Sequence, residues 1–391
     1  MNSKKIIIRS IHSRIQARLF QDKAIILLGP RQSGKTTLIK SLLEKTGEKY
    51  LLLNADEPDV RELFLGATST RLKRIIGDNR ILCIDEAQRI PDIGISLKLI
   101  IDQIPGVQVI ATGSSSFDLN ASINEPLTGR KFEFTLYPFS FGELEQEYGL
   151  LEERRLLEHR LVFGSYPEIV TSPGQEEERV RLLAGSYLFK DLLTLEGIKK
   201  PALLDKLVKA IALQIGSEVS FHELAQVTGA DNHTVERYVD LLEKAFVLVR
   251  LPAYSRNIRN EIKKGKKIYF QDNGIRNAVI GNFLPLSSRT DIGALWENYL
   301  VIERMKLMNN TGCWFSGYFW RTTQQQEIDY IEDQGQKLSA FEFKWNTGKK
   351  RVRFPKTFLN GYPKAKTAVI TPADYDLFLT FPADVVKKGQ N

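Results

Sequence analysis

The feature of this sequence that most limits its fold is a phosphate-binding signature placed between a strand pattern and a helix pattern. The stretch Gly29-Pro-Arg-Gln-Ser-Gly-Lys35-Thr36 fits GxxxxGK[ST], follows the apolar run 24–28 and precedes a helix-like segment. In this order, backbone N–H groups and the helix N-terminus face bound phosphates. The sequence therefore predicts an α/β fold with a P-loop on a parallel sheet. The alternative is a glycine-containing turn that carries a lysine by chance.

A second strand pattern ends in two carboxylates. The run Arg80-Ile-Leu-Cys-Ile-Asp85-Glu86 is typical of a buried strand. A carboxylate at the C-terminal end of a parallel strand lies beside the P-loop, so we expect Asp85 to hold Mg²⁺ through water. We expect Glu86 to polarise the attacking water. The alternative is a strand that ends in a solvated acidic turn.

A third strand, 107–111, ends in the hydroxyl-rich stretch Thr112-Gly-Ser-Ser-Ser116. Ser114 or Ser115 is expected to sense the γ-phosphate at the same sheet edge, unless the stretch is a plain Ser/Gly turn. Arg130 follows, and we expect it to stabilise the transition state in cis or in trans. An exposed loop arginine is the competing interpretation.

These residues make up one predicted nucleotide site, with ATP and Mg²⁺ as its cofactors. Catalytic roles are predicted for Lys35, Glu86 and Arg130, and Mg²⁺ ligands are predicted at Thr36 and Asp85. The predicted nucleotide contacts are Gly29, Pro30, Arg31, Gln32, Ser33, Gly34, Lys35, Thr36, Thr37, Asp85 and Ser114.

Composition limits the remaining possibilities. The chain has 391 residues, 42% hydrophobic and 26% charged, which leaves room for several globular domains. No apolar run approaches the roughly 18 residues of a membrane span, and the N-terminus lacks a signal-peptide pattern. We therefore expect a cytoplasmic protein with no membrane partner. Cys83 and Cys313 show no metal or disulfide spacing. The net charge of +8 is weak support for nucleic-acid binding.

Several motifs together carry a family resemblance. They are the P-loop stretch, Ile84-Asp-Glu-Ala-Gln88, Ala111-Thr-Gly-Ser-Ser, Leu127-Thr-Gly-Arg, Leu136-Tyr-Pro-Phe-Ser-Phe-Gly-Glu-Leu144, Gly164-Ser-Tyr-Pro-Glu168 and Tyr187-Leu-Phe-Lys-Asp191. The chain resembles AAA-type P-loop ATPases of bacteria and archaea that carry a C-terminal domain of unknown function. The resemblance extends to about residue 346. It implies an AAA-type core, a winged-helix segment and a C-terminal fold similar to PD-(D/E)xK nucleases.

The middle of the chain has helical patterns. We place the ATPase core at 1–145, a helical lid or connector at 146–212, a winged helix-turn-helix at 213–285 and the nuclease-like domain at 286–391. Amphipathic helices are expected at 152–162 and 176–193. Ser220 and Gly229 bound one predicted helix, and Asp231 caps the next.

The predicted winged helix has opposing charges. Two β-like segments, 246–251 and 267–270, flank a basic wing that contains Arg256, Arg259, Lys263, Lys264, Lys266 and Lys267. A DNA reader would place its second helix in the major groove and its wing on phosphates. The second helix, however, exposes Asp231, Glu236, Asp240 and Glu243, which would repel DNA. Packing between domains is the alternative role.

The C-terminal region has a possible second active site. Strand patterns at 327–332 and 338–345 form a predicted hairpin, and a loop at Gln334-Gly335 would pair Asp329 near Ala340 on the Glu342 face. Asp329 and Glu342 would bind Mg²⁺, and Lys344 would be catalytic by positioning the nucleophile. Glu297, on a helix predicted over 294–308, would add a ligand.

The D…ExK pattern is short and often arises by chance. The alternative is therefore a hairpin without an active site, with an alternating polar face and one cross-strand ion pair. The chain also has Gln325-Gln-Glu327 where family members often have Gly-Asp-Glu. The lysine-rich stretch 344–356 would hold phosphates or form a solvated face.

Two main functional hypotheses follow. The first is an Mg²⁺-dependent AAA-type ATPase whose nucleotide state controls a winged-helix and nuclease-like region that acts on DNA, with DNA cleavage as a second activity. The second is a nucleotide-gated protein-interaction module with an inactive nuclease-like domain that docks a protein partner. A nucleic-acid-binding regulator that uses ATP for assembly is a third. A homo-oligomer is expected if Arg130 acts in trans.

Overall fold

The structure is a computed structural model that describes residues 6–114, 123, 126–185, 200–255, 265–313, 315–346 and 352–380. The chain divides into two compact units. The N-terminal unit consists of Ile8–Pro138 and Lys244–Phe246, and the C-terminal unit consists of Met1–Ile7, Phe139–Glu243 and Val247–Asn391. The segments predicted as lid, winged helix and nuclease-like domain belong to the C-terminal unit, except for Lys244–Phe246.

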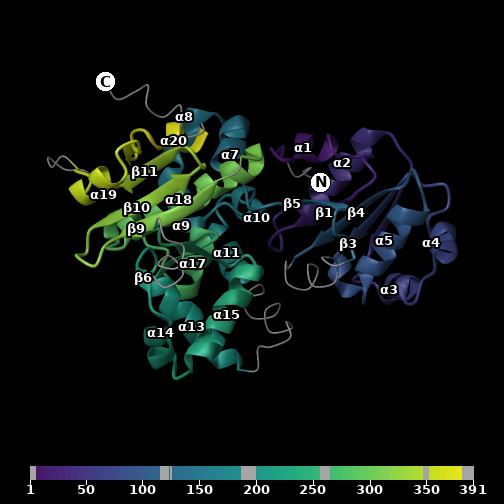
Figure 1. The fold of residues 1–391 in the computed structure, drawn as a ribbon, viewed down its shortest axis with the longest axis horizontal. Helices are drawn as coiled ribbons and strands as arrows, with labels where there is room; N and C mark the ends of the chain where they lie inside the picture. Colours follow the sequence, from purple (N-terminus) through teal and green to yellow (C-terminus); the bar gives the residue numbers. More distant parts are fainter. Residues whose placement is uncertain are drawn as a thin grey trace. The chain divides into compact units, whose positions relative to one another are not determined.

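The N-terminal unit is built on a five-stranded parallel sheet of order β2-β3-β4-β1-β5 (Figure 1). Its strands are β1 Ala24–Leu28, β2 Tyr50–Asn54, β3 Ile81–Asp85, β4 Gln108–Gly113 and β5 Lys131–Thr135. Strands β1 and β4 are buried along their whole length. Continuous apolar runs of this kind are typical of parallel strands that are covered on both faces.

Helices cover both faces of this sheet. They are α1 His12–Gln16, α2 Lys35–Thr46, α3 Pro58–Phe64, α4 Ser69–Ile76 and α5 Ile93–Gln103. Ile25 and Leu27 of β1 share a core with α1 and α2, whereas Ile26 and Leu28 share a core with α3, α4 and α5. This alternation follows the two-residue period of a strand. Because the strands are parallel, the loops after β1, β3 and β4 meet at one edge of the sheet.

The C-terminal unit contains many helices and two further sheets. Its helices are α7 Phe141–Tyr148, α8 Leu150–Arg155, α9 Leu157–Phe163, α10 Pro167–Val170, α11 Glu176–Gly185, α13 Pro201–Leu213, α14 Phe221–Thr228, α15 Asn232–Lys244, α17 Asn273–Ile280, α18 Ile292–Thr311, α19 Lys356–Gly361 and α20 Tyr375–Thr380. Two short 3₁₀ turns are η1 Ala87–Arg89 in the N-terminal unit and η3 Leu286–Ser288 in the C-terminal unit.

A four-stranded sheet of order β12-β11-β10-β9 forms one part of the C-terminal unit. Its strands are β9 Ser316–Arg321, β10 Glu327–Asp333, β11 Leu338–Phe343 and β12 Lys366–Ile370. β12 runs parallel to β11, and the other neighbours are antiparallel. Trp296 and Leu300 of α18 pack with Phe341 and Phe343 of β11 in a common buried core.

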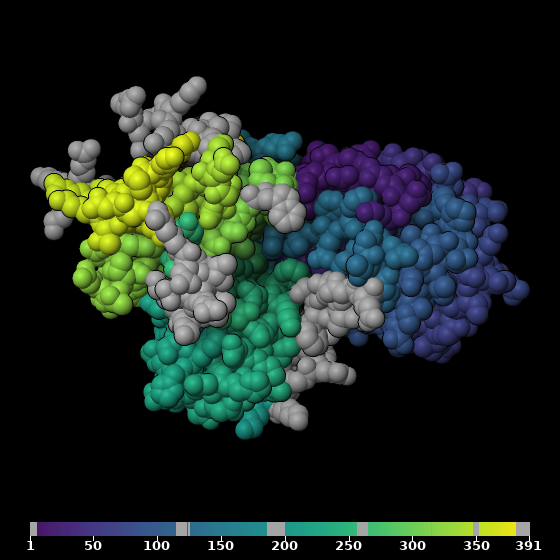
Figure 2. All heavy atoms as spheres, viewed as in Figure 1, coloured from purple at the N-terminus to yellow at the C-terminus, as the bar shows by residue number. Residues whose placement is uncertain are grey.

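The other sheet of this unit has three strands in the order β6-β8-β7: β6 Glu218–Val219, β7 Leu248–Pro252 and β8 Lys266–Phe270. Helices α13, α14 and α15 belong to the same stretch of chain and form a continuous surface, teal in Figure 2. Ser220 caps α14 by accepting from Glu223, Gly229 ends it in the left-handed conformation, and Asp231 accepts from the Thr234 N–H. The predicted helix boundaries are therefore confirmed here.

Two local predictions were wrong. The single helix expected over 152–162 is two helices, α8 and α9, joined at Leu156. The hairpin loop is the four-residue segment 334–337, closed by the Gln334 N–H donating to the Lys337 carbonyl. The longer loop shifts the register by two, so that Tyr330 pairs with Phe341. A shift of two residues keeps Asp329 on the predicted face.

Several predicted residues lie outside the described residues. They are Ser115, the motif 187–191, the wing residues Arg256, Arg259, Lys263 and Lys264, and positions 347–351 of the lysine-rich stretch.

Candidate functional site

The P-loop follows a tight backbone path between β1 and α2. Gly29 has φ +152°, and a Cβ there would lie 2.1 Å from the Leu136 carbonyl oxygen. Gln32 and Gly34 both have left-handed φ values, 58° and 94°. Alternation of this kind turns successive N–H groups toward one point, which is how a loop forms an anion-binding nest. Gly29 is required by the close approach of Leu136.

Lys35 extends back over this loop. Its Nζ donates to the carbonyl oxygens of Gly29 (2.9 Å) and Pro30 (3.0 Å). Burial is the largest influence on the pKa of Lys35 and lowers it; Glu86 and Asp85 raise it and Arg31 lowers it, so that the pKa falls to about 8. A buried ammonium that is bonded only to neutral carbonyls favours a negatively charged ligand.

Ser33 and Arg9 complete the loop. Ser33 is fully buried, and its Oγ has no hydrogen-bond partner among the described residues. Arg9 donates through Nη1 to the Ser33 carbonyl (2.7 Å) and through Nη2 to the Tyr137 carbonyl (2.5 Å). Arg9 was not predicted as a site residue, because it belongs to no motif and lies far from Ser33 along the chain.

Asp85 joins β3 to the loop and to β4. Its Oδ2 accepts from Thr36 Oγ1 at 2.7 Å, and its Oδ1 accepts from Thr112 Oγ1. The structure therefore brings together Thr36 and Asp85, the two predicted Mg²⁺ ligands of this site. Thr112, the residue that fixes the second oxygen, had been noted only as part of a hydroxyl-rich stretch.

Glu86 begins the 3₁₀ turn η1 and has a left-handed φ of 53°. Its N–H donates to Thr112 Oγ1 at 3.1 Å. Its Oε2 accepts from Gln88 Nε2 (2.6 Å) and from Ser114 Oγ (3.1 Å). Ser114, predicted as a γ-phosphate sensor, thus contacts the predicted water-polarising carboxylate. Gln88 was missed as a site residue, since the sequence offered it only as part of a family motif.

Arg130 lies at the N-terminal ends of the parallel strands, opposite the ends that the P-loop follows. Its carbonyl accepts from the N–H of Ala24, the first residue of β1, whereas the P-loop follows the last residue, Leu28. A five-residue strand is roughly 15 Å long. The Arg130 guanidinium forms an ion pair with Asp102 at 2.8 Å. These contacts hold Arg130 at the start of β5; its role at the nucleotide, in cis or in trans, stays a prediction.

The chemistry of the loop fits a nucleotide with Mg²⁺. The buried, unpartnered Ser33 Oγ offers a hydroxyl, Lys35 offers a cation, and Asp85 with Thr36 offers oxygen ligands of the type that Mg²⁺ prefers. Gly29, Pro30, Arg31, Gln32, Gly34 and Thr37 belong to the same loop and helix start.

A second charged cluster lies in the C-terminal unit and contains the predicted D…ExK residues. Lys344 Nζ lies 2.7 Å from Glu342 Oε2 and 3.0 Å from Asp329 Oδ2. The Phe343 N–H also donates to Asp329 Oδ2, at 2.7 Å. The structure therefore assembles the predicted set, with the lysine bonded to both carboxylates.

Glu297 of α18 meets a lysine that the sequence had assigned to the wing. Lys267 Nζ, almost fully buried on β8, lies 2.8 Å from Glu297 Oε1 and 2.5 Å from Glu327 Oε1. Tyr269 OH donates to the same Glu297 oxygen at 2.6 Å. Lys267 was missed as a member of this cluster because its partners lie on α18 and β10, far along the chain.

Burial dominates the electrostatics of this second cluster. Burial and the neighbouring Asp329 raise the pKa of Glu342 to about 7, and burial raises the pKa of Glu297. The two carboxylates raise the pKa of Lys267 despite its burial. Among the residues that the structure describes, no three or more His, Cys, Asp or Glu side chains converge as a metal site. Glu297, Asp329 and Glu342 as metal ligands therefore remain a prediction.

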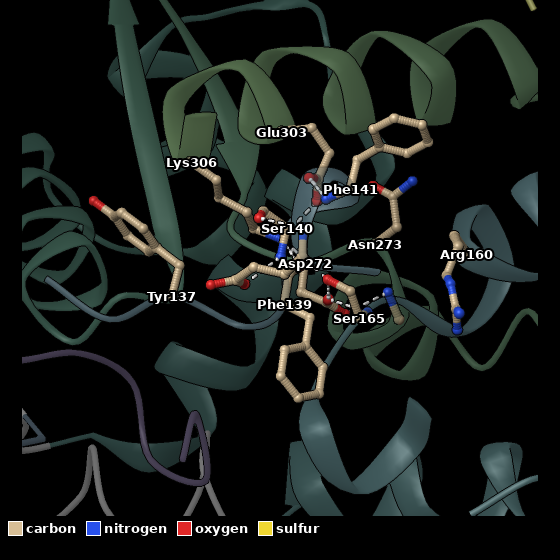
Figure 3. A network of polar contacts seen from close by, with 12 residues as sticks. Tyr137, Phe139, Ser140, Phe141, Arg160, Ser165, Asp272, Asn273, Glu303 and Lys306 are labelled. Carbon is tan, nitrogen blue, oxygen red and sulfur yellow. Dashed lines mark hydrogen bonds and ion pairs between the residues drawn. The ribbon is translucent and has the colours of Figure 1, made fainter. Parts of the chain in front are cut away.

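A third polar network, shown in Figure 3, is buried between α7, α17 and α18. Lys306 Nζ donates to Glu303 Oε1 (2.7 Å), the Phe139 carbonyl (2.9 Å) and Ser165 Oγ (3.0 Å). Glu303 Oε2 accepts from the Phe141 N–H at 2.6 Å, and Asp272 Oδ2 accepts from the Ser165 N–H at 2.8 Å. The family landmarks around residues 139–144 and 164–168 thus meet in one buried network.

Sheet order, P-loop geometry and the carboxylates after β3 define a P-loop core in the N-terminal unit. Residues 21–145 match the family model described as an AAA domain, in the part of the chain that has this P-loop fold. Residues 154–285 and 292–384 match models of two different domains of unknown function. No helix within the described residues is both long enough and apolar enough to cross a membrane.

The chain has relatives along most of its length. An uncharacterized protein of Mycobacterium tuberculosis is 27% identical over 394 residues, covering 97% of this chain and 84% of that protein. An uncharacterized protein of Haemophilus influenzae is 24% identical, covering 82% of this chain and 83% of that protein. Among solved structures, a Walker-type ATPase of Pyrococcus abyssi has a TM-score of 0.49 at 18% identity, covering 70% of this chain and 96% of that chain.

Proposed function

We propose that the N-terminal unit binds ATP and hydrolyses it with Mg²⁺. The observation that carries this proposal is the set of contacts at one sheet edge: Lys35 over the P-loop, Thr36 bonded to Asp85, and Glu86 beside them. Each of these groups has the chemistry needed at a triphosphate. The AAA-type core supports the same assignment.

The residues divide the work of hydrolysis. The P-loop N–H groups and Lys35 bind the β and γ phosphates, and the Ser33 hydroxyl donates to a phosphate oxygen. Thr36 and Asp85 would hold Mg²⁺, which neutralises charge on the phosphates when it is bound. Glu86 orients the attacking water and takes its proton. Arg130 would complete the site of a neighbouring copy in a homo-oligomer.

The C-terminal unit is proposed to respond to the nucleotide state and to act on DNA. The order α13-β6-α14-α15-β7-β8, with sheet order β6-β8-β7, supports a winged helix at 213–285. The Asp329, Glu342 and Lys344 contacts support a nuclease-like domain at 286–391. The segment 146–212 would connect these parts to the ATPase core as a lid.

One observation favours the alternative, a nucleotide-gated protein-interaction module without cleavage. Lys267 and Lys344 already form ion pairs with all four carboxylates of the second cluster: Glu297, Glu327, Asp329 and Glu342. A metal ion would have to compete with these buried lysines. In that case the cluster stabilises the fold, and the C-terminal unit binds a protein partner.

The test combines ATP turnover and cleavage of labelled DNA, comparing the wild type with Glu86→Gln and Lys344→Ala. ATP turnover that is lost in Glu86→Gln supports the proposed ATPase, and its absence in the wild type overturns it. DNA cleavage that is lost only in Lys344→Ala supports the nuclease-like domain. If the protein hydrolyses ATP, but DNA is not cut and does not stimulate ATP turnover, the protein-interaction alternative is favoured.

A further inference from the structure

The side-chain amide of Gln88 donates hydrogen bonds through its nitrogen, whereas its oxygen accepts none from the described residues. Its Nε2 donates to Glu86 Oε2 at 2.6 Å and to Ser114 Oγ at 3.1 Å. Its Oε1 is buried, and none of the described residues donates a hydrogen bond to it. Gln88 thus places a free acceptor next to the carboxylate that is proposed to activate water.

The orientation of this amide is fixed by charge. If the amide were reversed, its oxygen would face the Glu86 carboxylate, and two acceptors would meet without a proton between them. Nε2 must therefore face Glu86, which leaves Oε1 as the orphan. A buried acceptor without a donor is energetically unfavourable. Such a group in a native site is explained by a strained or catalytic role, or by a bound water or ion.

The backbone holds Gln88 in this place. Glu86, at the start of the turn, has a left-handed φ, and its N–H is bonded to Thr112 on β4. The strand therefore ends abruptly, and the turn Ala87–Arg89 directs Gln88 back toward Ser114, at the end of β4. A non-glycine residue in this conformation is strained, and such strain is concentrated at functional sites.

We infer that Gln88 is a further catalytic residue of the proposed ATPase: Nε2 holds the Glu86 carboxylate, and Oε1 accepts a hydrogen bond from the attacking water. This inference rests on the proposed function. Within the described residues, the side-chain hydrogen bonds of Glu86 go to Oε2, which leaves Oε1 as the oxygen for the water. One water O–H then points to Glu86 and the other points to Gln88.

The reaction step balances with these groups. The water oxygen forms a bond to the γ-phosphorus, and the bond from that phosphorus to the β–γ bridging oxygen breaks. The bond electrons leave with ADP, and the other product is inorganic phosphate. One water proton passes to Glu86 Oε1 and is later released to solvent. Gln88 takes no proton, since an amide oxygen orients water without acting as a base.

The experiment measures ATP affinity and the rate of the hydrolysis step in single turnovers. Gln88→Ala is expected to lower that rate by roughly 10²-fold, with ATP affinity and the thermal unfolding midpoint unchanged. Gln88→Glu keeps the size of the side chain but places a second carboxylate against Glu86, and it is expected to lower the rate at least as much. Arg89→Ala, on the same turn and in an exposed ion pair with Asp56, is the matched control.

A double variant separates catalysis from a structural role. Adding Gln88→Ala to Glu86→Gln is expected to cost little further rate, because the two residues act on one water. If the wild type turns over ATP and both Gln88 variants match it, the inference is overturned while the ATPase stands. A full additional loss in the double variant also overturns it. No ATP turnover in the wild type overturns the proposed function itself.

Discussion

Thr36 Oγ1 lies 2.7 Å from Asp85 Oδ2, so the first turn of helix α2 after the P-loop is hydrogen-bonded to the end of strand β3. The two residues come from separate motifs and share no local sequence signal. Their contact, together with the Thr112 bond to the other Asp85 oxygen, fixes a carboxylate where Mg²⁺ would be held beside a triphosphate.

Asp85→Asn tests this arrangement. The amide keeps the size of the side chain but removes the charge, so the Mg²⁺ concentration for half-maximal ATP turnover is expected to rise about 10- to 100-fold, as for other groups that act on a metal through water. A magnesium titration of turnover measures this. Asp56→Asn, in an exposed ion pair with Arg89, is the control that should leave the titration unchanged.

Lys35 gives nucleotide binding a pH dependence. Its pKa of about 8 means that about half of the Lys35 side chains are uncharged at pH 8 in the folded protein without nucleotide, and more at higher pH. Phosphates beside the ammonium raise its pKa, so binding takes up a proton in this range and ATP affinity falls as pH rises above about 8. Calorimetry in two buffers with different ionisation enthalpies measures the uptake. Equal apparent enthalpies at pH 8.5 would contradict the prediction.

Mixing two inactive variants tests Arg130 in trans. If Arg130 acts on the nucleotide of a neighbouring copy, Arg130→Ala and Glu86→Gln are each expected to be nearly inactive alone. An equimolar mixture should recover part of the turnover, because some neighbouring pairs then combine an intact Arg130 with an intact Glu86. No recovery in an oligomer that exchanges subunits would argue against the role in trans.

Lys306 should be important for the stability of the C-terminal unit. Lys306→Met leaves Glu303 buried without its cation, a change expected to lower the free energy of unfolding by about 3–5 kcal/mol. Urea denaturation measures the loss. Adding Glu303→Gln should restore part of it, and Lys209→Met, in an exposed pair with Asp205, should cost no more than about 1 kcal/mol.

Glu342 predicts a decline of stability toward neutral pH. Its pKa in the folded chain, about 7, lies above its ordinary value of 4.5. Between these values the folded protein binds more protons than the unfolded one, so stability falls as pH rises. Glu342→Gln is expected to reduce this decline, while the raised pKa of Glu297 leaves some of it. An unchanged stability profile would refute the prediction, and Glu177→Gln, at an exposed position, is the control.

The sequence predicted most of what is local in this fold. The P-loop, the strand before Asp85 and the caps of α14 and α15 depend on neighbouring residues, so their patterns are visible in a single sequence. The roles of Arg9, Gln88 and Lys267 were not predicted, because the partners of each residue come close to it only in the folded chain. Whether Arg130 acts in cis or in trans could not be predicted, because this depends on contacts that no local sequence pattern encodes.

The register of the hairpin shows the same limit. Two strand patterns and the polar residues between them do not determine how many of those residues form the loop. The face of Asp329 was predicted correctly because a shift of two residues preserves it, whereas the register of the two strands was not.

Helix α18 contributes side chains to two separate polar clusters, which limits where residues can be inserted or deleted in this chain. Glu297 contacts the second charged cluster, Asn298 is bonded to the backbone of Phe270, and Glu303 and Lys306 belong to the third network. Inserting or deleting one residue between Glu297 and Glu303 would rotate one set about 100° relative to the other. Length variation among relatives should therefore be absent from this segment and begin only beyond Thr311, where the helix ends.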